Sequence, residues 1–457
     1  MSRMFQALGH PNYRLWATGA LVSNVGTWMQ RVAQDWLVLT ALTDHDGAAV
    51  GLTTGLQFAP ILVFGPYAGV LSDRLDKRRI LLATQSALGL LGLVQGLLVL
   101  TGTVELWHVY AIALGLGVAS AIDAPARQSF TSELVSSADL PNAVALNSTS
   151  FNLARLAGPG AAGLLIGAVG TGWAFLFNAA SFAAVLVSLL RLRPELLHRS
   201  APAPRGRHQV REGIAYVRSR PRVLLILVMA GIVGTFTMNF QITNAIMAAQ
   251  VFAVGPDGFG LLGSVMAVGT LAGALLAARR RSLRMALVLA AAFALGLAAI
   301  GSALAPGYAW FAVSLVLVGV TAITFLNGCN TLIQLSIDAQ YRGRVMALYM
   351  AVIQGGSFLG APLVGWLAGA AGPRWALLAS GTAALVAGAV GVVVLVRWGE
   401  GSLREQLRAV WAARRRAARA GSDPATLGGD PALLGRGPGT ASRDPGGAAQ
   451  TVSTTSS

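Results

Sequence analysis

Charged and polar side chains inside long apolar segments are the residues of this sequence that could do chemistry. The first segment carries Asn24, Trp28, Arg31 and Asp35 at steps of four, three and four residues, which places them on one face of a helix. A carboxylate is costly to hold in hydrocarbon, so Asp35, with Gln34 beside it, indicates a proton- or cation-responsive group on a transport path. The alternative is that Arg31 and Asp35 only form an ion pair at the outer rim of the segment.

A second set of charges stands in two later segments. Asp123 and Arg127 lie four residues apart. The following segment repeats polar residues and a proline at helical spacing, namely Ser148, Asn152, Arg155 and Pro159. Arg155 falls near the middle of its segment, where an unpaired cation is costly, so we expect Asp123 to be its partner. This pair either lines the transport path or locks two helices together.

Uncharged amides mark two segments of the second half of the chain. They are Asn239, Gln241 and Asn244 in one segment and Asn327, Asn330 and Gln334 in the other. Together with nearby methionines they suit the wall of a cavity for a bulky, partly apolar molecule. Each amide taken alone is more typical of hydrogen bonding between helices.

Residue patterns of enzyme sites are missing from the apolar segments of the sequence. They contain no metal-ligand cluster, no nucleophile with a base and no phosphate-binding loop, and the five histidines lie in loops, in the N-terminal segment or, for His108, at the very start of a span. The single cysteine, Cys329, excludes an intramolecular disulfide. We therefore expect no metal, no cofactor and no enzymatic activity.

The composition is that of a protein embedded in a lipid bilayer. Of its 457 residues 54% are hydrophobic and 11% are charged, whereas a soluble domain has about 25% charged residues. The net charge of +16 comes from arginines clustered between apolar segments and in the C-terminal tail, so it does not indicate a nucleic-acid partner. Twelve segments can span a membrane as helices: 15–41, 50–72, 79–101, 107–131, 143–168, 173–192, 223–251, 259–279, 284–305, 308–336, 345–371 and 374–396.

The cations fall in alternate loops, which predicts the orientation of the chain. Cationic loops lie at 74–79, 191–222, 279–284 and 342–344, whereas the first loop carries Asp44 and Asp46 without any lysine or arginine. By the positive-inside rule the cationic loops and both termini are cytoplasmic. We expect no cleaved signal peptide, because the N-terminal segment has no short apolar core followed by a cleavage site.

The chain divides into two repeated halves. An offset of 202 residues relates Gly158 to Gly360, Gly163 to Gly365 and Trp173 to Trp375. This repetition predicts an all-α membrane protein with a six-helix bundle at 1–192, a cytoplasmic linker at 193–222 and a second six-helix bundle at 223–396. The tail, 397–457, is expected to be amphipathic over 402–420 and disordered from 421 onward.

The loop after the second span resembles motif A of the major facilitator superfamily. Its pattern is carried by Gly69, Asp73, Arg74, Lys77 and Arg78. Asp76 stands where that family usually has a second glycine. The resemblance implies a gating role: in the outward-open state Asp73 would face the start of the eleventh helix near Val345, with Arg127 holding the carboxylate.

Two further patterns resemble the exporters of this superfamily. Gly158, Pro159 and Gly163 match part of motif C, which implies close, bendable helix packing, although Ala154 and Ala162 replace two of its glycines. The stretches 12–16 and 26–30 resemble the branch that contains enterobactin and drug efflux proteins. Where those exporters have an arginine in the fourth helix, this chain has Ala111.

The resemblance implies a secondary active transporter that exports amphipathic small molecules, such as drugs, siderophores or secondary metabolites, by alternating access. We expect it to use the proton gradient and to act as a monomer in the plasma membrane of a bacterium. An uptake carrier and a lipid flippase are the alternatives within transport, and a membrane-embedded enzyme is the less favoured alternative class.

The orientation can be tested with single cysteines in a Cys329→Ala background. An impermeant thiol reagent added outside intact cells should label Asp44→Cys and spare Arg205→Cys, because the positive-inside rule places position 205 in the cytoplasm. Labelling of position 205 with protection of position 44 would show that the topology is inverted.

Overall fold

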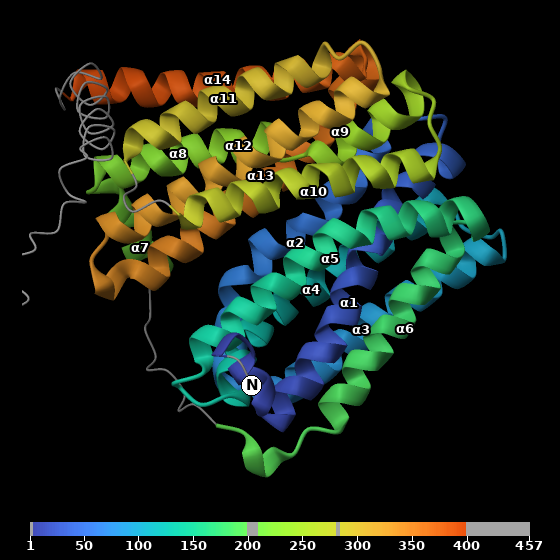
Figure 1. The fold of residues 1–457 in the computed structure, drawn as a ribbon, viewed down its shortest axis with the longest axis vertical. Helices are drawn as coiled ribbons and strands as arrows, with labels where there is room; N and C mark the ends of the chain where they lie inside the picture. The colour runs from blue at the N-terminus through green and yellow to red at the C-terminus, as the bar shows by residue number, and fades with distance from the viewer. Residues whose placement is uncertain (1–2, 199–208, 280–283, 399–457) are drawn as a thin grey trace, which may run out of the picture. The chain divides into compact units, whose positions relative to one another are not determined.

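The computed structural model describes residues 3–198, 209–279 and 284–398, and every regular element in these ranges is a helix, as the apolar segments predict (Figure 1). The elements of the first half are η1 (Arg3–Gly9), α1 (Pro11–Leu37), the π-helix η2 (Val38–Leu42), α2 (Gly47–Arg74), α3 (Lys77–Leu100), α4 (Leu106–Leu134), α5 (Leu140–Val169), α6 (Thr171–Leu190) and η3 (Pro194–Leu196). Those of the second half are α7 (Gln209–Arg218), α8 (Pro221–Phe236), α9 (Phe240–Ile246), the π-helix η4 (Met247–Val251), α10 (Pro256–Ala278), α11 (Met285–Ala303), α12 (Tyr308–Ser336), η5 (Ala339–Tyr341), α13 (Arg342–Ala371) and α14 (Pro373–Arg397).

The expected set of membrane-spanning helices is largely confirmed. Eleven helical segments of the described residues are long and apolar enough to cross a bilayer. The expected first span, α1, is 27 residues long but does not meet this criterion of composition. Its polar face, which carries Arg31 and Asp35, lowers its mean hydropathy, yet α1 packs between α5 and α6 like its neighbours.

The expected seventh span is broken near its middle. Helix α8 ends at Phe236 and α9 begins at Phe240, so residues 237–239 are not helical. One side chain replaces part of the lost helical bonding, because Asn239 Nδ2 donates to the Thr235 carbonyl (2.7 Å). The Thr237 hydroxyl donates to the Ser380 carbonyl of α14 (2.9 Å) and so joins the broken stretch to that helix. Broken helices are tolerated at membrane depth only where protein or a cavity surrounds them.

A short helix, α7, lies within the expected linker. Its Glu212 pairs with Arg344 of α13 at 2.9 Å, and the hydroxyl of its Tyr216 donates to Asp338 at 3.0 Å. Part of the linker therefore packs on the second half of the chain. Residues 199–208 and 399–457 lie outside the described residues, so the expected domain boundaries and the amphipathic tail stay predictions.

Helix ends fall where local chemistry stops or starts them. The side chain of Asp76, the departure from the motif, accepts from the Arg79 amide (3.1 Å) and so caps the N-terminus of α3. Gly170 and Gly372, related by the offset of 202 residues, separate α5 from α6 and α13 from α14. Their positive φ values of 90° and 103° are conformations that favour glycine.

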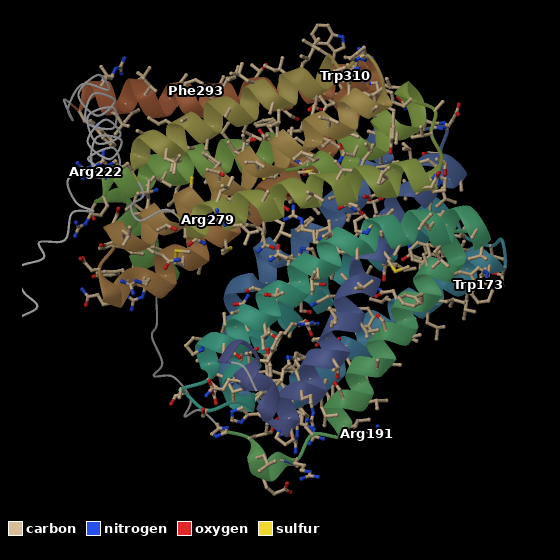
Figure 2. The ribbon with its side chains drawn as sticks, in the orientation of Figure 1. Trp173, Arg191, Arg222, Arg279, Phe293 and Trp310 are labelled. Atoms are coloured by element: carbon tan, nitrogen blue, oxygen red, sulfur yellow. The ribbon has the colours of Figure 1, made fainter. Side chains whose placement is uncertain are left out.

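Tryptophans and arginines lie at opposite ends of the spans. Figure 2 labels Trp173 and Trp310, which are 50% and 68% exposed and stand at the starts of α6 and α12. It also labels Arg191, Arg222 and Arg279, which lie at the opposite, cationic ends of their helices. We call the tryptophan end the outer end and the arginine end the inner end, after the orientation that the sequence predicts.

The two halves share one apolar core, and it lies at the outer end. Its buried side chains come from both halves, among them Leu37, Leu39, Ile246, Met247 and Phe259. The other clusters of buried residues each belong to one half: one consists of second-half residues such as Phe325 and Tyr349, and another of first-half residues such as Trp16 and Phe130. Apolar burial therefore joins the halves at the outer end.

Small residues allow close approach between the halves along α2 and α13. A Cβ atom added to Gly365 would lie 2.1 Å from the Gly47 carbonyl oxygen, and one added to Gly51 would lie 2.3 Å from the Ala361 carbonyl oxygen. Helices α5 and α10 form the second contact between the halves. The two halves therefore share an apolar contact at the outer end and have separate apolar cores toward the inner end.

Gly365→Ala should weaken the outer contact. Its methyl group meets backbone rather than a movable side chain, and overpacking of this kind typically costs about 1–3 kcal/mol. Spin labels at Asp44→Cys and Pro306→Cys, in outer loops of the two halves, should therefore report more of a longer distance. Gly369→Ala is the matched control, because its nearest neighbour lies at 3.9 Å. Identical distance distributions in the two variants would contradict the proposed role of this contact.

Candidate functional site

A cavity of about 210 Å³, whose largely apolar wall also carries charged and amide side chains, lies between the two halves beside the shared outer core. Its first-half lining consists of Trp28, Arg31, Val32, Gln34, Asp35, Thr54, Gln57, Phe58, Arg155 and Pro159. Its second-half lining consists of Met238, Asn239, Phe240, Gln241, Ile242, Asn244, Phe259, Gly263, Met266, Ala267 and Ser357. The broken stretch between α8 and α9 therefore forms part of the wall, which explains why irregular backbone is tolerated there.

Asp35 lies in this cavity near residues of both halves, and it is only 5% exposed. Gln241 of α9 also lines the cavity and is close enough to Asp35 for an electrostatic interaction, but no hydrogen bond between their side chains is found among the described residues. Arg31, one helical turn earlier, is close enough for an electrostatic interaction, but no ion pair within 4.0 Å joins it to Asp35 among the described residues. The structure thus contradicts an ion pair at an open outer rim, because Asp35 is buried beside the shared apolar core.

Two arginines of the cavity share one aromatic ring. The guanidinium carbon of Arg31 lies 5.0 Å from the centroid of the Trp28 ring, and that of Arg155 lies 5.7 Å from it. Phe151 packs edge-on against the same tryptophan at 5.9 Å between ring centroids. The cation–π contact of Arg155 joins α5 to α1, whereas that of Arg31 lies within α1. The like charges of Arg31 and Arg155 repel each other.

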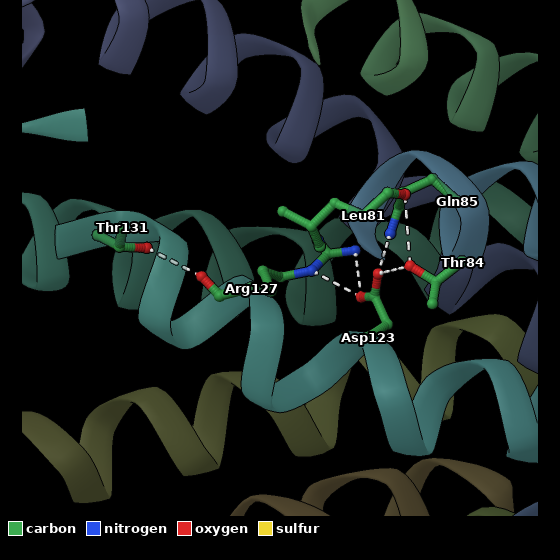
Figure 3. Close-up of polar contacts among 6 residues, drawn as sticks. All are labelled: Leu81, Thr84, Gln85, Asp123, Arg127 and Thr131. Carbon is green, nitrogen blue, oxygen red and sulfur yellow. Dashed lines mark hydrogen bonds and ion pairs between the residues drawn. The ribbon is translucent and has the colours of Figure 1, made fainter. Parts of the chain in front are cut away.

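Asp123 is not the partner of Arg155, contrary to the expectation from the sequence. It pairs with Arg127 of its own helix, whose Nε and NH2 atoms each lie 3.0 Å from Oδ2 (Figure 3). Its Oδ1 accepts from the Thr84 hydroxyl and from Gln85 Nε2 of α3, both at 2.7 Å. Both oxygens are therefore satisfied outside the cavity, and the cluster joins α3 to α4.

The remaining predicted polar residues divide between the cavity and the helix contacts. Gln34 lines the cavity. Asn24 Nδ2 donates to the Ser150 hydroxyl of α5 at 3.3 Å. Asn152 Nδ2 donates to the Ser148 carbonyl of its own helix at 2.8 Å, and Asn152 is not among the lining residues. The predicted place of Asn152 on the path is therefore not seen in this structure.

The motif C-like residues lie at helix crossings. A Cβ atom on Gly158 would lie 2.6 Å from Trp28 Cβ, and one on Gly163 would lie 2.5 Å from the Pro256 carbonyl oxygen. Pro159, between them, lines the cavity. Gly158 and Gly163 thus let α5 pack closely on α1 and on α10, beside the residues that carry charge in the cavity.

The charged loop fixes the inner end of the first half. Lys77 forms an ion pair with Glu133 of α4. The guanidinium group of Arg78 donates to the carbonyls of Leu189 (2.8 Å) and Leu190 (3.1 Å) at the C-terminus of α6, where a cation is favoured by the helix dipole. Gly69, Asp73 and Arg74 lie in the helical part of α2, but the structure does not describe their side chains or burial. The expected contact of Asp73 with Arg127 stays a prediction.

The amides of the second half separate into two groups. Asn239, Gln241 and Asn244 line the cavity, and Asn244 Oδ1 is buried there without a hydrogen-bond partner among the described residues. Gln334 donates to Asn330 on its own helix instead. Other lining residues were not predicted from the sequence. Gln57 could have been found as a polar residue within an apolar run, whereas the sequence does not mark Phe259, Met266 or Ser357 as cavity residues.

The Asp123 cluster predicts a stability effect. Asp123→Asn should lower the free energy of unfolding in detergent by about 3 kcal/mol. This is the lower end of the cost of removing one partner of a buried ion pair. We expect the lower end because the Arg127 side chain is 27% exposed. Asp44→Asn, a change at a fully exposed carboxylate, is the control. If both variants unfold at the same denaturant concentration, the cluster does not hold α3 to α4.

Comparisons with known proteins agree with this architecture. The family model described as "Transmembrane secretion effector" matches residues 3–416. The macrolide efflux protein A of Streptococcus pyogenes is 25% identical over 380 residues, covering 81% of this chain and 92% of the relative. The enterobactin exporter of Shigella flexneri is 26% identical over 392 residues, covering 85% and 92%.

A solved structure shares the fold. The bacterial homologue of the human lysosomal transporter Spinster, in an inward-facing and unoccupied conformation, superposes with a TM-score of 0.66 at 17% identity, covering 83% of this chain and 96% of that one. At this level of identity the likeness concerns the fold alone.

Proposed function

Because this chain belongs to the transmembrane secretion effector family of the major facilitator superfamily, we propose that it exports amphipathic small molecules across a bacterial plasma membrane by alternating access, driven by the proton gradient. The observation that carries the proposal is one cavity between two halves, with charged and amide side chains among wall residues from both and a shared apolar core beside it at the outer end. A molecule that enters such a cavity from the inner side can leave outward only after the outer contacts open.

The outer contacts are suited to opening and closing. Glycines at the crossing of α2 and α13 bring backbone against backbone, so the contact depends on close fit rather than on long interdigitating side chains. In the outward-open state the inner ends would meet instead, and the motif around Asp73, Lys77 and Arg78 would hold them, as the family resemblance implies. Ligands shift such an equilibrium only through contacts that differ between the states.

Asp35 supplies a group whose properties depend on protonation. As a carboxylate it can only accept hydrogen bonds, whereas the protonated acid also has an O–H to donate. It faces the cavity from α1, and the Gln241 amide faces the same cavity from α9, in the other half. A proton on Asp35 therefore changes the charge of the cavity and the hydrogen bonds that its carboxyl group can form there, which are two properties that a coupling group needs.

Export is the favoured direction because two relatives are named for it, one an efflux protein and one an exporter. The packing of Gly158 and Gly163, which resembles the exporter motif, points the same way. Accumulation of a panel of dyes and antibiotics in cells that produce the protein, with and without a protonophore, separates export from uptake. Faster accumulation in producing cells would indicate an uptake carrier.

Asp35→Asn should abolish proton-driven export while leaving the amount of protein in the membrane unchanged. The amide keeps the shape of the carboxylate and removes the group that takes up a proton. In proteoliposomes with an imposed pH gradient, transport should fall to the rate of protein-free vesicles, whereas Asp44→Asn should transport normally. Gradient-driven export by Asp35→Asn at the parental rate would eliminate Asp35 as the coupling group.

A further inference from the structure

The positive and negative charges of the side chains that line the cavity do not cancel. Among the described residues that line it, Arg31 and Arg155 are cationic and Asp35 is the anionic one. With Asp35 ionised the cavity therefore carries one net positive charge, and with Asp35 protonated it carries two. Holding such charge within a membrane protein is costly unless a counter-charge or water compensates it.

The protein itself leaves the donors of both arginines unused. No hydrogen bond found among the described residues begins at an N–H group of Arg31 or Arg155, and no described carboxylate lies within 4.0 Å of either guanidinium group. Trp28 contacts both groups through its ring, but a ring face does not replace hydrogen-bond acceptors in the guanidinium plane. Each group has five N–H donors in a fork that fits carboxylate and phosphate oxygens.

We infer that the exported molecule carries an anionic group, which binds the guanidinium groups of Arg31 and Arg155 beside Trp28. This inference rests on the proposed function, since it names the chemical class of the molecule bound in the same cavity. The rest of the molecule would be apolar or aromatic, because Phe259, Met266 and Phe58 complete the wall. The buried Asn244 Oδ1, which has no partner among the described residues, is available to a hydrogen-bond donor of the same molecule.

The charge balance also gives an order of events. A monoanion bound while Asp35 is ionised leaves the cavity with no net charge, so the loaded protein moves no charge across the hydrocarbon. After release outside, the empty cavity is positive, and a proton taken up by Asp35 makes it more so. A membrane potential that is negative inside favours the return of this positive cavity toward the cytoplasm.

The test is binding to the purified full-length protein in a neutral detergent. The probes are dansylglycine, which is anionic, dansylglycinamide, which is neutral, and N-(2-aminoethyl)dansylamide, which is cationic. They share one fluorophore and differ in charge. The anionic probe should bind at least tenfold more tightly than the other two. Arg155→Gln and Arg31→Gln should each abolish this preference, whereas Arg155→Lys, which keeps the charge, should retain most of it.

Two further variants separate the site from general effects. Arg374→Gln, whose guanidinium group donates to the Ala305 carbonyl away from the cavity, should leave all three affinities unchanged. Asp35→Asn should bind the anionic probe at least as tightly as the parent, because it removes a competing negative charge, even though it loses gradient-driven export.

Three results would overturn the inference. The three probes could bind equally, the cationic probe could bind most tightly, or none of the probes could bind. An anion preference that survives Arg155→Gln would also overturn it, since Arg155 would then only pack on Trp28. A failure of this inference can be distinguished from a failure of the proposed function, because binding in detergent requires neither a proton gradient nor a direction of transport. Anion binding without export would refute the proposed function alone, and export without anion preference would refute this inference alone.

Discussion

The cost of placing Arg31, Asp35 and Arg155 at membrane depth is the constraint on which the rest of the structure depends. A charge in hydrocarbon is tolerated only in the interior of a bundle or beside water, so these residues require a cavity. The structure provides it between two halves: α1 and α5 bring the charges, and the broken stretch between α8 and α9 brings the amides. The ring of Trp28 then holds the guanidinium groups of Arg31 and Arg155 in place.

The same constraint explains why the closure beside the cavity is apolar and close-packed. A shared core at the outer end separates the charges from the outer surface, and backbone contact at Gly47 and Gly365 brings the halves together there. Toward the inner end each half has its own core, so the halves can part without exposing a common one. A cavity with an apolar contact on its outer side suits the proposed mechanism of alternating access.

Much of this arrangement could be predicted from the sequence. Hydropathy and the alternation of cationic loops predicted the spans, and the spacing from Asn24 to Asp35 predicted a polar face on α1. The partners could not be predicted, because they depend on how each helix is rotated about its axis. Asp123 meets Arg127, Thr84 and Gln85 rather than Arg155. Asn152 bonds to its own helix. Gln241 lines the cavity next to the break in the seventh span, and no proline marks that break.

The most direct test of the central claim is whether one cavity residue can be reached from both sides of the membrane. Ser357 lines the cavity from α13, and Ser357→Cys in a Cys329→Ala background gives a single reporter thiol. An impermeant thiol reagent should modify it in inside-out vesicles without a gradient, and in right-side-out vesicles once the outer contacts open during transport. Modification from the same single side under resting and transporting conditions would contradict alternating access around this cavity.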